Sequence, residues 1–441
     1  MSVTVERRRN LVNGEFVEGT RGEWEQVLNP ATGEVIAEVP KGSEEDVDGA
    51  VEAAHEAFDG WFETTPMERA EMLLHLANAL EESSEELARL ESRNVGKPIS
   101  LARDEMPFIV DNLRFFAGAC RVMEGQATSE YLRGYTSMIR REPVGVVGQI
   151  APWNFPLMMA VWKIGPALAT GNTVVLKPSE QTPLTTLRMA ELAAGIFPKG
   201  VLNVITGDGD PVGAGIVSHP KVDMVSLTGD ITTGKAVAKA AADTVKRVHL
   251  ELGGKAPVVV FDDADVEALV ENVRFTGYAN SGQDCTAATR IIAAPRVYED
   301  VAQKLADAAS TIKTADPAEG EDVEMGPVVS KAQQERILAF LDRAKESGSA
   351  EVLIGGDRNG DRGFFVEPTV VVGAPQEAEI IQKEVSAPWL RSSASPTTRR
   401  PFDGLTMSPT ASPPPCGRGT SAGPWERRGG CDSGRFGSTT I

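Results

Sequence analysis

Residues 144–176 read VGVVGQIAPWNFPLMMAVWKIGPALATGNTVVL, and this stretch decides the fold. Its two ends are short runs rich in β-branched residues, while its middle is rich in Ala and Leu, which is typical of a strand, a helix and a second strand. Three further β-branched runs follow at 201–205, 222–227 and 248–250, with helical stretches between them. This alternation predicts a parallel sheet of repeated βαβ units that binds its ligands at the carboxyl ends of the strands.

The segments on either side of this sheet are also regular. Residues 67–94 carry leucines at helical spacing and predict one long amphipathic helix, and a second helix is expected over 101–124. Beyond residue 253, strand-like runs at 258–261 and 291–294 alternate with helical patterns near 266–279, 298–313 and 331–347. A second α/β domain therefore follows the first.

The composition excludes several classes of protein. With 63 acidic and 44 basic residues the net charge is -19, which would repel phosphate backbones and argues against nucleic acid as a partner. The basic residues are 15 Lys and 29 Arg, and an acidic, Lys-poor surface is typical of a protein kept soluble in a salt-rich cytoplasm. Four scattered Cys without a CxxC pair predict neither a disulfide framework nor a metal site.

We expect a cytoplasmic protein, because the sequence predicts neither a signal peptide nor a membrane span. The first residues, MSVTVERRRNLVNGEF, have no apolar stretch behind their basic residues and do not form a signal peptide. Residues 143–162 are uncharged and long enough to cross a bilayer, but several Pro and Gly within them favour a strand, a loop and a helix over a membrane span.

Three residues outside the regular runs have catalytic chemistry. Cys285 lies in GQDC (residues 282–285), in a loop between a helix and a strand, although a lone Cys is more often a small buried hydrophobe. Glu251 in LELGGK (250–255) ends a strand, and in an apolar setting its raised pKa would suit a general base. Asn154 in APWN (151–154) could donate to an oxyanion or could be a turn residue only.

Three other strand ends could bind a nucleotide. LKPSE (176–180) offers a Lys and a Glu for ribose hydroxyls or phosphate, and GDGDPVG (207–213) is a glycine-rich turn before a helix. LTGD (227–230) opens another helix. Such glycine spacing by itself is weak evidence, because many tight turns share it.

The ordered set APWN, LKPSE, LTGD, LELGGK and GQDC closely resembles the NAD(P)-dependent aldehyde dehydrogenase superfamily over residues from about 10 to 385. EYLRGYTSMIRR (130–141), FPLMMAVWK (155–163) and GQDCTAATR look most like its γ-aminobutyraldehyde and betaine-aldehyde branch. The resemblance implies a Rossmann-like cofactor domain with N-terminal helices over 1–252 and a catalytic α/β domain over 253–385. It also implies that members form homodimers or homotetramers.

The resemblance implies a mechanism. Cys285 would attack the aldehyde carbon, Asn154 and the backbone N–H of Cys285 would hold the oxyanion, and Glu251 would activate the water that hydrolyses the thioester. NAD is favoured over NADP, since the Glu180 carboxylate would repel a 2'-phosphate. The expected cofactor contacts are Ala151, Pro152, Trp153, Lys177, Ser179, Glu180, Gly209, Gly213, Gly229, Asp230, Thr233 and Glu384.

One residue departs from the family pattern, and three others are candidates for substrate contacts. Asp230 replaces the Ser that is usual in its turn, so repulsion of a pyrophosphate would lower NAD affinity unless its side chain swings out. Asp284 could attract an ammonium group, at the cost of disfavouring the neighbouring thiolate, and Trp162 could add a cation-π contact. Asp111 is a further candidate for the substrate tunnel. The alternative for all three is ordinary surface or core, so other small aldehydes stay open as substrates.

The character of the chain changes at Ser386. The last 56 residues contain seven Arg, no Lys and three acidic residues, without periodicity, and predict a disordered tail over 386–441 that truncates the catalytic domain. The family continues IQKEV (381–385) with Phe-Gly-Pro-Val, whereas this chain reads SAPW. Codons TCG-GCC-CCG-TGG encode SAPW, and one added T in front gives TTC-GGC-CCC-GTG, which encodes Phe-Gly-Pro-Val. A frameshift is therefore expected.

Two functional classes follow. The first is an active NAD-dependent aldehyde dehydrogenase that acts on a small aldehyde. The second is an inactive remnant that binds NAD at most, since the tail replaces part of the substrate pocket and the strand used for subunit pairing. NADH formation separates the two.

Overall fold

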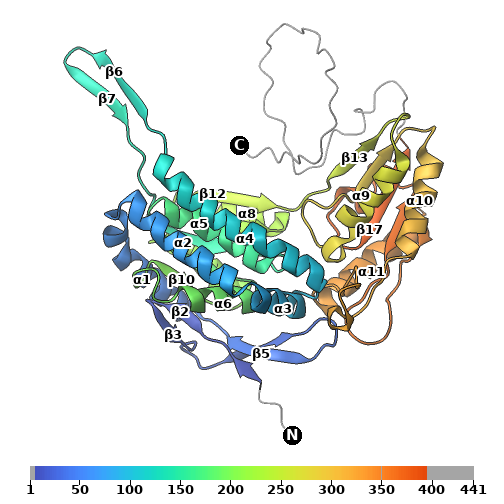
Figure 1. Cartoon of the computed structure of the whole chain (residues 1–441), viewed down its shortest axis with the longest axis horizontal. Coiled ribbons are helices and arrows are strands. Elements are labelled where there is room, and N and C mark those ends of the chain that lie inside the picture. The colour runs from blue at the N-terminus through green and yellow to red at the C-terminus, as the bar shows by residue number, and fades with distance from the viewer. Residues whose placement is uncertain (1–4, 349, 395–441) are drawn as a thin grey trace. The chain divides into compact units, whose positions relative to one another are not determined.

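The computed structural model describes residues 5–348 and 350–394. A seven-stranded sheet forms the centre of the first part of the chain, in the order β12-β11-β8-β9-β10-β2-β3 (Figure 1). The five strands from β12 to β10 are parallel, and β2 and β3 add antiparallel edges. The strands are β2 (Asn10–Val12), β3 (Glu15–Val17), β8 (Val146–Ile150), β9 (Thr173–Lys177), β10 (Leu202–Val204), β11 (Met224–Gly229) and β12 (Arg247–Leu252).

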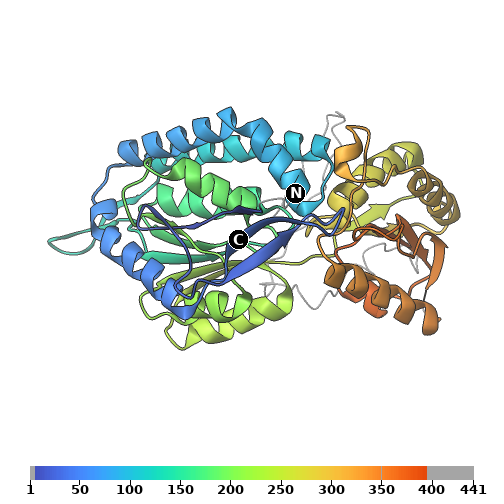
Figure 2. The same ribbon diagram turned by 90° about the horizontal axis from the view of Figure 1, so that it is seen from below.

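Helices cover both faces of this sheet, as Figure 2 shows. Alternate residues of β8 and β9 belong to different cores: Val147 and Val174 pack on one face, and Val146 and Val175 on the other. Strands buried on both faces read as continuous apolar runs, which is why residues 144–150 and 173–176 predict strands correctly. The first face carries α2 (Pro66–Glu82), α3 (Ser84–Val95), α4 (Ile99–Ala119), α5 (Pro156–Ala169) and α6 (Leu184–Ala193); the second carries α1 (Glu44–Phe62), α7 (Ala214–Ser218) and α8 (Ile231–Ala242).

The helix predicted over 67–94 is two helices in the structure. α2 ends and α3 begins at Ser83, whose φ of -96° and ψ of 9° are not helical. Thr65 and Glu68 form a capping box at the start of α2, where Pro66 also suits the first turn. The apolar spacing continues through the break, so periodicity did not reveal it.

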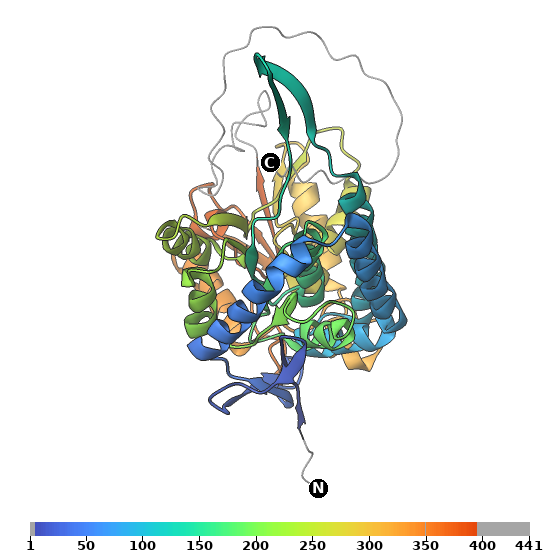
Figure 3. The ribbon, with the colours of Figure 1, turned by 90° about the vertical axis from the view of Figure 1, so that its left-hand side faces the viewer.

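Smaller sheets lie at the periphery. β1 (Glu6–Arg7), β5 (Val35–Pro40) and β4 (Trp24–Leu28) form one of them. β6 (Gln126–Leu132) and β7 (Tyr135–Ile139) form a hairpin that extends away from the helices (Figures 1 and 3). Its side chains Leu132, Tyr135 and Met138 are exposed.

A five-stranded sheet forms the second part of the chain, in the order β13-β14-β17-β16-β15. Only β15 is antiparallel to its neighbour. The strands are β13 (Pro257–Val260), β14 (Arg290–Ala293), β15 (Glu351–Ile354), β16 (Thr369–Val372) and β17 (Trp389–Ala394), and the helices are α9 (Val266–Tyr278), α10 (Tyr298–Ser310), α11 (Lys331–Glu346) and α12 (Glu379–Gln382). Single turns complete the list: η1 (Cys120–Val122), η2 (Gly209–Gly213), η3 (Ala279–Gly282) and η4 (Pro317–Glu319).

The five-stranded sheet continues past the boundary predicted at Val385. β17 pairs with β14 on one side and with β16 on the other. Backbone hydrogen bonds to both neighbouring strands hold this segment in the sheet, and such bonds do not require alternating apolar side chains. The sequence lacks that alternation and therefore did not predict the strand. Residues 395–441 of the predicted tail lie outside the described residues.

The stretch over residues 143–162 forms β8, a loop and the first half of α5, as predicted. Within residues 5–348 and 350–394, no helix combines the length and the apolarity that crossing a bilayer requires. The α/β fold predicted from the sequence is confirmed.

Candidate active site

The order of the strands brings the predicted motifs to one edge of the large sheet. β8, β9 and β10 follow one another in one direction, whereas β11 and β12 lie on the other side of β8. The order of the strands therefore reverses between β8 and β11, and open α/β sheets bind ligands at the carboxyl ends of the strands beside such a reversal. APWN follows β8, LTGD ends β11, and Glu251 lies near the end of β12.

The loop that carries Cys285 begins with a left-handed turn. Asn280, Ser281 and Gly282 have φ values of 50°, 57° and 66°, and the two non-glycine residues are buried. Left-handed backbone is costly for residues with a Cβ and persists where surrounding contacts fix it. Here Asn280 Nδ2 donates to Asn154 O at 2.9 Å, and Ser281 Oγ donates to Gly326 O at 2.8 Å.

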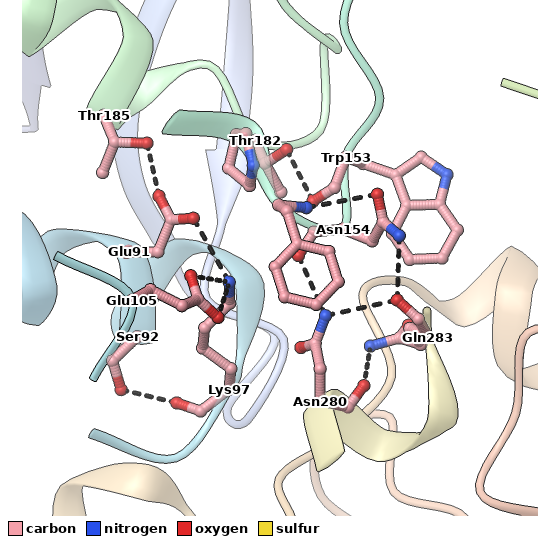
Figure 4. A network of polar contacts seen from close by, with 12 residues as sticks. Glu91, Ser92, Lys97, Glu105, Trp153, Asn154, Thr182, Thr185, Asn280 and Gln283 are labelled. Carbon is pink, nitrogen blue, oxygen red and sulfur yellow. Dashed lines mark hydrogen bonds and ion pairs between the residues drawn. The ribbon is translucent and has the colours of Figure 1, made fainter. Parts of the chain in front are cut away.

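Asn154 joins β8 to this loop. Its Nδ2 donates to Gln283 O at 2.9 Å, and its Oδ1 accepts from the backbone N–H of Phe155 at 3.2 Å (Figure 4). Gln283 is itself held, because its Oε1 accepts from Val329 N at 2.9 Å. A side-chain amide has two N–H groups, and Gln283 O accepts from one of them. The second N–H of Asn154 can donate to an oxyanion formed at Cys285.

Cys285 is half-buried beside the loop that follows β12. A Cβ placed on Gly254 would lie 2.6 Å from Cys285 O, so only glycine permits this approach. Burial, and after it the charges of Asp284, Glu251 and Glu384, raise the pKa of the Cys285 thiol to about 12. The thiol is therefore protonated in the free protein, and attack on a carbonyl requires a base.

Glu251 is exposed, and the prediction of an apolar setting for it is wrong. The reason is the position of β12 at the edge of the sheet, where alternate side chains face outward. The carboxylate nevertheless contributes to the raised pKa of Cys285, so the two groups lie within electrostatic reach of each other.

Lys163 on α5 is a residue that sequence reasoning missed. It is buried, and its Nζ donates to Ser226 Oγ at 3.0 Å, which in turn lies 3.2 Å from His249 Nδ1. Burial lowers the pKa of Lys163 to about 7, against a smaller opposing effect of Glu251. The sequence analysis included Lys163 in FPLMMAVWK (155–163) but gave it no role.

Glu384 lies against the same loop. A Cβ on Gly253 would collide with Glu384 Oε2, and Glu384 Oε1 accepts from Ser386 Oγ at 2.6 Å. Burial raises the pKa of Glu384. A small pocket beside Cys285 is lined by Gly254, Lys255, Gly282, Asp284, Thr289, Glu384, Val385, Ser386 and Ala387.

The segment after β9 has the residues expected for a ribose. Lys177 is buried, and its Nζ lies 2.9 Å from Pro178 O and 3.4 Å from Glu180 Oε2. Glu25, which sequence reasoning missed, belongs to the same cluster: burial, Asp208 and Glu180 raise the pKa of its carboxyl group. Its Oε2 is buried with no hydrogen-bond partner among the described residues. An orphaned acceptor beside a lysine fits a nucleoside with free hydroxyl groups.

Asp230 caps α8. Its carboxylate accepts from Thr232 N at 2.6 Å, Thr233 N at 3.2 Å and Thr233 Oγ1 at 2.7 Å, and these bonds help to lower its pKa against burial. The side chain thus folds onto the helix and uses donors that would otherwise face an anion.

The other expected cofactor residues occupy the neighbouring strand ends. Ala151 is buried, Pro152 and Trp153 are half-buried, and Trp153 O accepts from Thr182 Oγ1 at 3.0 Å. Ser179 is buried after β9. Gly209 and Gly213 bound η2, and Gly229 ends β11.

The three substrate candidates are not brought to one place. Asp284 lines the pocket beside Cys285, and Trp162 is 47% exposed on α5. Asp111 is exposed on α4, in a surface groove with Glu81 and Arg114 that shares no lining residue with that pocket.

Comparisons with known proteins define the class of this site. The model of the "Aldehyde dehydrogenase family" matches residues 16–391, so the chain belongs to the aldehyde dehydrogenase family. It is 42% identical over 382 residues to an aldehyde dehydrogenase of Davidiella tassiana, which covers 86% of this chain and 76% of the relative. An aldehyde dehydrogenase of Emericella nidulans is 43% identical over 384 residues, with the same coverage.

Two solved structures are similar over most of the chain. An NAD+ complex of an aldehyde dehydrogenase from Bacillus cereus is 41% identical with a TM-score of 0.88, covering 91% of this chain and 82% of that protein. A betaine aldehyde dehydrogenase from Staphylococcus aureus, in complex with NAD+, is 39% identical with a TM-score of 0.88, covering 90% and 80%. The superfamily predicted from the motifs is confirmed.

Proposed function

We propose that the protein oxidises a small aldehyde to the carboxylic acid, with NAD as the hydride acceptor and Cys285 as the nucleophile. The observation that carries this proposal is the hydrogen bond from Asn154 Nδ2 to Gln283 O at 2.9 Å, because it ties the end of β8 to the loop of Cys285. Membership of the family and the NAD+ complexes of two relatives support the same activity.

The first step forms a bond between Cys285 Sγ and the aldehyde carbon. Since the pKa of the thiol is raised to about 12, its proton must leave as the bond forms, and a water molecule takes it. The carbonyl oxygen becomes an oxyanion that accepts from the free N–H of Asn154 Nδ2 and from the backbone of Cys285.

The second half converts the thioester into the product. The residues after β8 and β9 would hold NAD, which would supply the hydride acceptor that converts the thiohemiacetal on Cys285 into this thioester. Glu251 takes a proton from a water molecule, the water oxygen attacks the acyl carbon, and the bond to Sγ breaks as the acid leaves. The exposure of Glu251 gives it access to that water and lets it return its proton to solvent.

The residues after β9 support NAD over NADP. After burial, the charges of Asp208 and Glu180 raise the pKa of Glu25, and all three carboxylates lie within electrostatic reach of Lys177. A 2'-phosphate placed among them would meet net negative charge, whereas ribose hydroxyl groups can donate to the free Oε2 of Glu25.

For the substrate we propose an aldehyde that carries an ammonium or trimethylammonium group. Asp284 lines the pocket beside Cys285, where its negative charge also raises the pKa of the thiol. A cationic substrate would offset that charge. The similarity to the Staphylococcus aureus betaine aldehyde dehydrogenase supports this class.

NADH absorbance with a panel of aldehydes tests the proposal. Activity is expected in the wild type and in Cys120→Ser, a matched control for the other described thiol, which is buried in the first core. Cys285→Ser should abolish turnover while NAD binding remains. A variant of Cys285 that keeps full activity would overturn the assignment, and faster turnover of neutral than of cationic aldehydes would overturn the substrate class.

Four other sequence predictions remain proposals. The division at 252/253 lies between the last strand of the large sheet and the first strand of the second sheet. Association into dimers or tetramers can be measured by analytical ultracentrifugation, and localisation in the cytoplasm by cell fractionation. Resequencing of the gene tests the frameshift.

A further inference from the structure

A buried cluster of charges lies beside the proposed site. Lys97, which follows α3, is 0% exposed, and its Nζ lies 2.9 and 2.8 Å from the two oxygens of Glu105 and 3.3 Å from Glu91 Oε1. Glu91 Oε2 accepts from Thr185 Oγ1 at 2.5 Å, and Ser92 Oγ donates to Lys97 O at 2.7 Å. The cluster therefore links α3, α4 and α6 (Figure 4).

Stability alone is a weak reason for such a cluster. Removing three charges from water is costly, and replacing buried ion pairs by apolar residues is often neutral or stabilising. Lys97 Nζ also lies 4.3 Å from the centre of the Phe155 ring. A desolvated cation over an aromatic face is attracted strongly enough to fix the position of the ring.

Phe155 connects this cluster to the oxyanion donor. Its backbone N–H donates to Asn154 Oδ1, while Asn154 Nδ2 donates to Gln283 O. Any shift of Phe155 therefore moves the peptide and the amide of Asn154. Misplacing a catalytic group by about 1 Å can cost about 100-fold in rate.

We propose that Lys97, held by Glu91 and Glu105, is a positioning residue that fixes the ring of Phe155 and through it the amide of Asn154. This inference deepens the proposed function, on which it rests. Because the charge of Lys97 acts on Asn154 through the ring of Phe155, the positioning requires both an aromatic side chain at 155 and a cation at 97.

The first test compares variants of the ring. Phe155→Leu removes the aromatic face and should lower kcat by about tenfold to fiftyfold. This loss is smaller than the loss of about 100-fold or more that follows complete removal of an oxyanion donor, because Asn154 is displaced and not removed. Its KM should change less than threefold. Phe155→Tyr keeps the face and should retain activity. Equal losses in both variants, or a loss that appears only in KM, would overturn the proposal.

A double-mutant cycle then shows whether the effect passes through Asn154. In an Asn154→Ala background, Phe155→Leu should lower kcat by less than twofold more, because the group it positions is gone. If the double variant lowers kcat by the product of the two single-variant factors, the proposal is contradicted. Lys97→Met should behave as Phe155→Leu does. Arg69→Met is the matched control, since Arg69 is a buried cation of α2 whose bonds go to Ala169 O and to Thr64.

Hydrogen exchange gives a readout that does not depend on turnover. Exchange of the Phe155 amide should accelerate about tenfold in Phe155→Leu and in Lys97→Met, and stay unchanged in Phe155→Tyr and Arg69→Met. An enzyme without activity would refute the proposed function while this measurement still decides the positioning role. Unchanged exchange in both test variants would refute the positioning role itself.

Discussion

The thiol of Cys285 offers a quantitative prediction. Burial and three nearby carboxylates raise its pKa to about 12 from an ordinary 9.0. At pH 8 the thiolate fraction is then lower by about 1000-fold. A thiolate of higher pKa is intrinsically more nucleophilic, with a Brønsted slope of about 0.4–0.5, which returns a factor of about 20. Alkylation of Cys285 should therefore be roughly 50-fold slower than that of an ordinary thiol.

The assay is iodoacetamide labelling of the free enzyme, followed peptide by peptide by mass spectrometry between pH 7 and pH 10. The rate should rise about tenfold per pH unit without a plateau, because the pKa lies above the whole range. Asp284→Asn removes the second-largest cause of the shift and should accelerate labelling by about twofold to tenfold at each pH.

Two results would refute this reasoning. A rate that levels off between pH 9 and pH 10 would mean that the free thiol ionises near its ordinary pKa. An unchanged rate in Asp284→Asn would mean that the neighbouring carboxylate does not act on the sulfur.

Three further predictions concern the cofactor and the buried cluster. Asp230→Ser keeps a helix cap but removes an exposed negative charge, so calorimetry should show NAD binding about threefold to tenfold tighter, and an equal Kd would contradict the argument. Glu180→Gln should improve kcat/KM for NADP relative to NAD by about tenfold, and an unchanged ratio would remove Glu180 from the specificity. Burial raises the pKa of Glu105 from 4.5 to about 7. Between pH 4.5 and pH 7 the folded protein therefore keeps a proton on Glu105 that the unfolded chain has released. The resulting stability is present below pH 4.5 and is lost as the pH rises through 7. Urea unfolding should therefore show the wild type losing stability relative to Glu105→Gln as the pH rises from 4.5 to 8, whereas a constant difference would contradict the shift.

Much of the fold could be predicted from local patterns. The apolar runs of β8 and β9 are continuous because both faces of the sheet are covered, and the alternation with helices gives the parallel order. Since parallel strands share one carboxyl edge, the motifs that follow β8, β11 and β12 had to meet.

The predictions that were wrong share one cause: contacts between distant parts of the chain decided the local structure. The spacing of leucines continues across Ser83, so the break between α2 and α3 left no periodic signal. The exposure of Glu251 follows from the edge position of β12, and β17 is ordered by two neighbouring strands.

Contacts between distant residues were also invisible in the sequence. Lys97 and Phe155 are 58 positions apart, and only the packing of α3, α4 and α5 brings them together. The orphaned Oε2 of Glu25 likewise comes from a strand far from LKPSE.

The covalent step tests the central claim most directly. Glu251→Gln should still form the bond to Cys285 but hydrolyse it slowly, so that mixing with NAD and an aldehyde leaves the acyl group on the enzyme. Mass spectrometry of the digested protein is predicted to find that acyl mass on the peptide that contains Cys285. An acyl group on another residue, or none while NADH accumulates, would contradict the account.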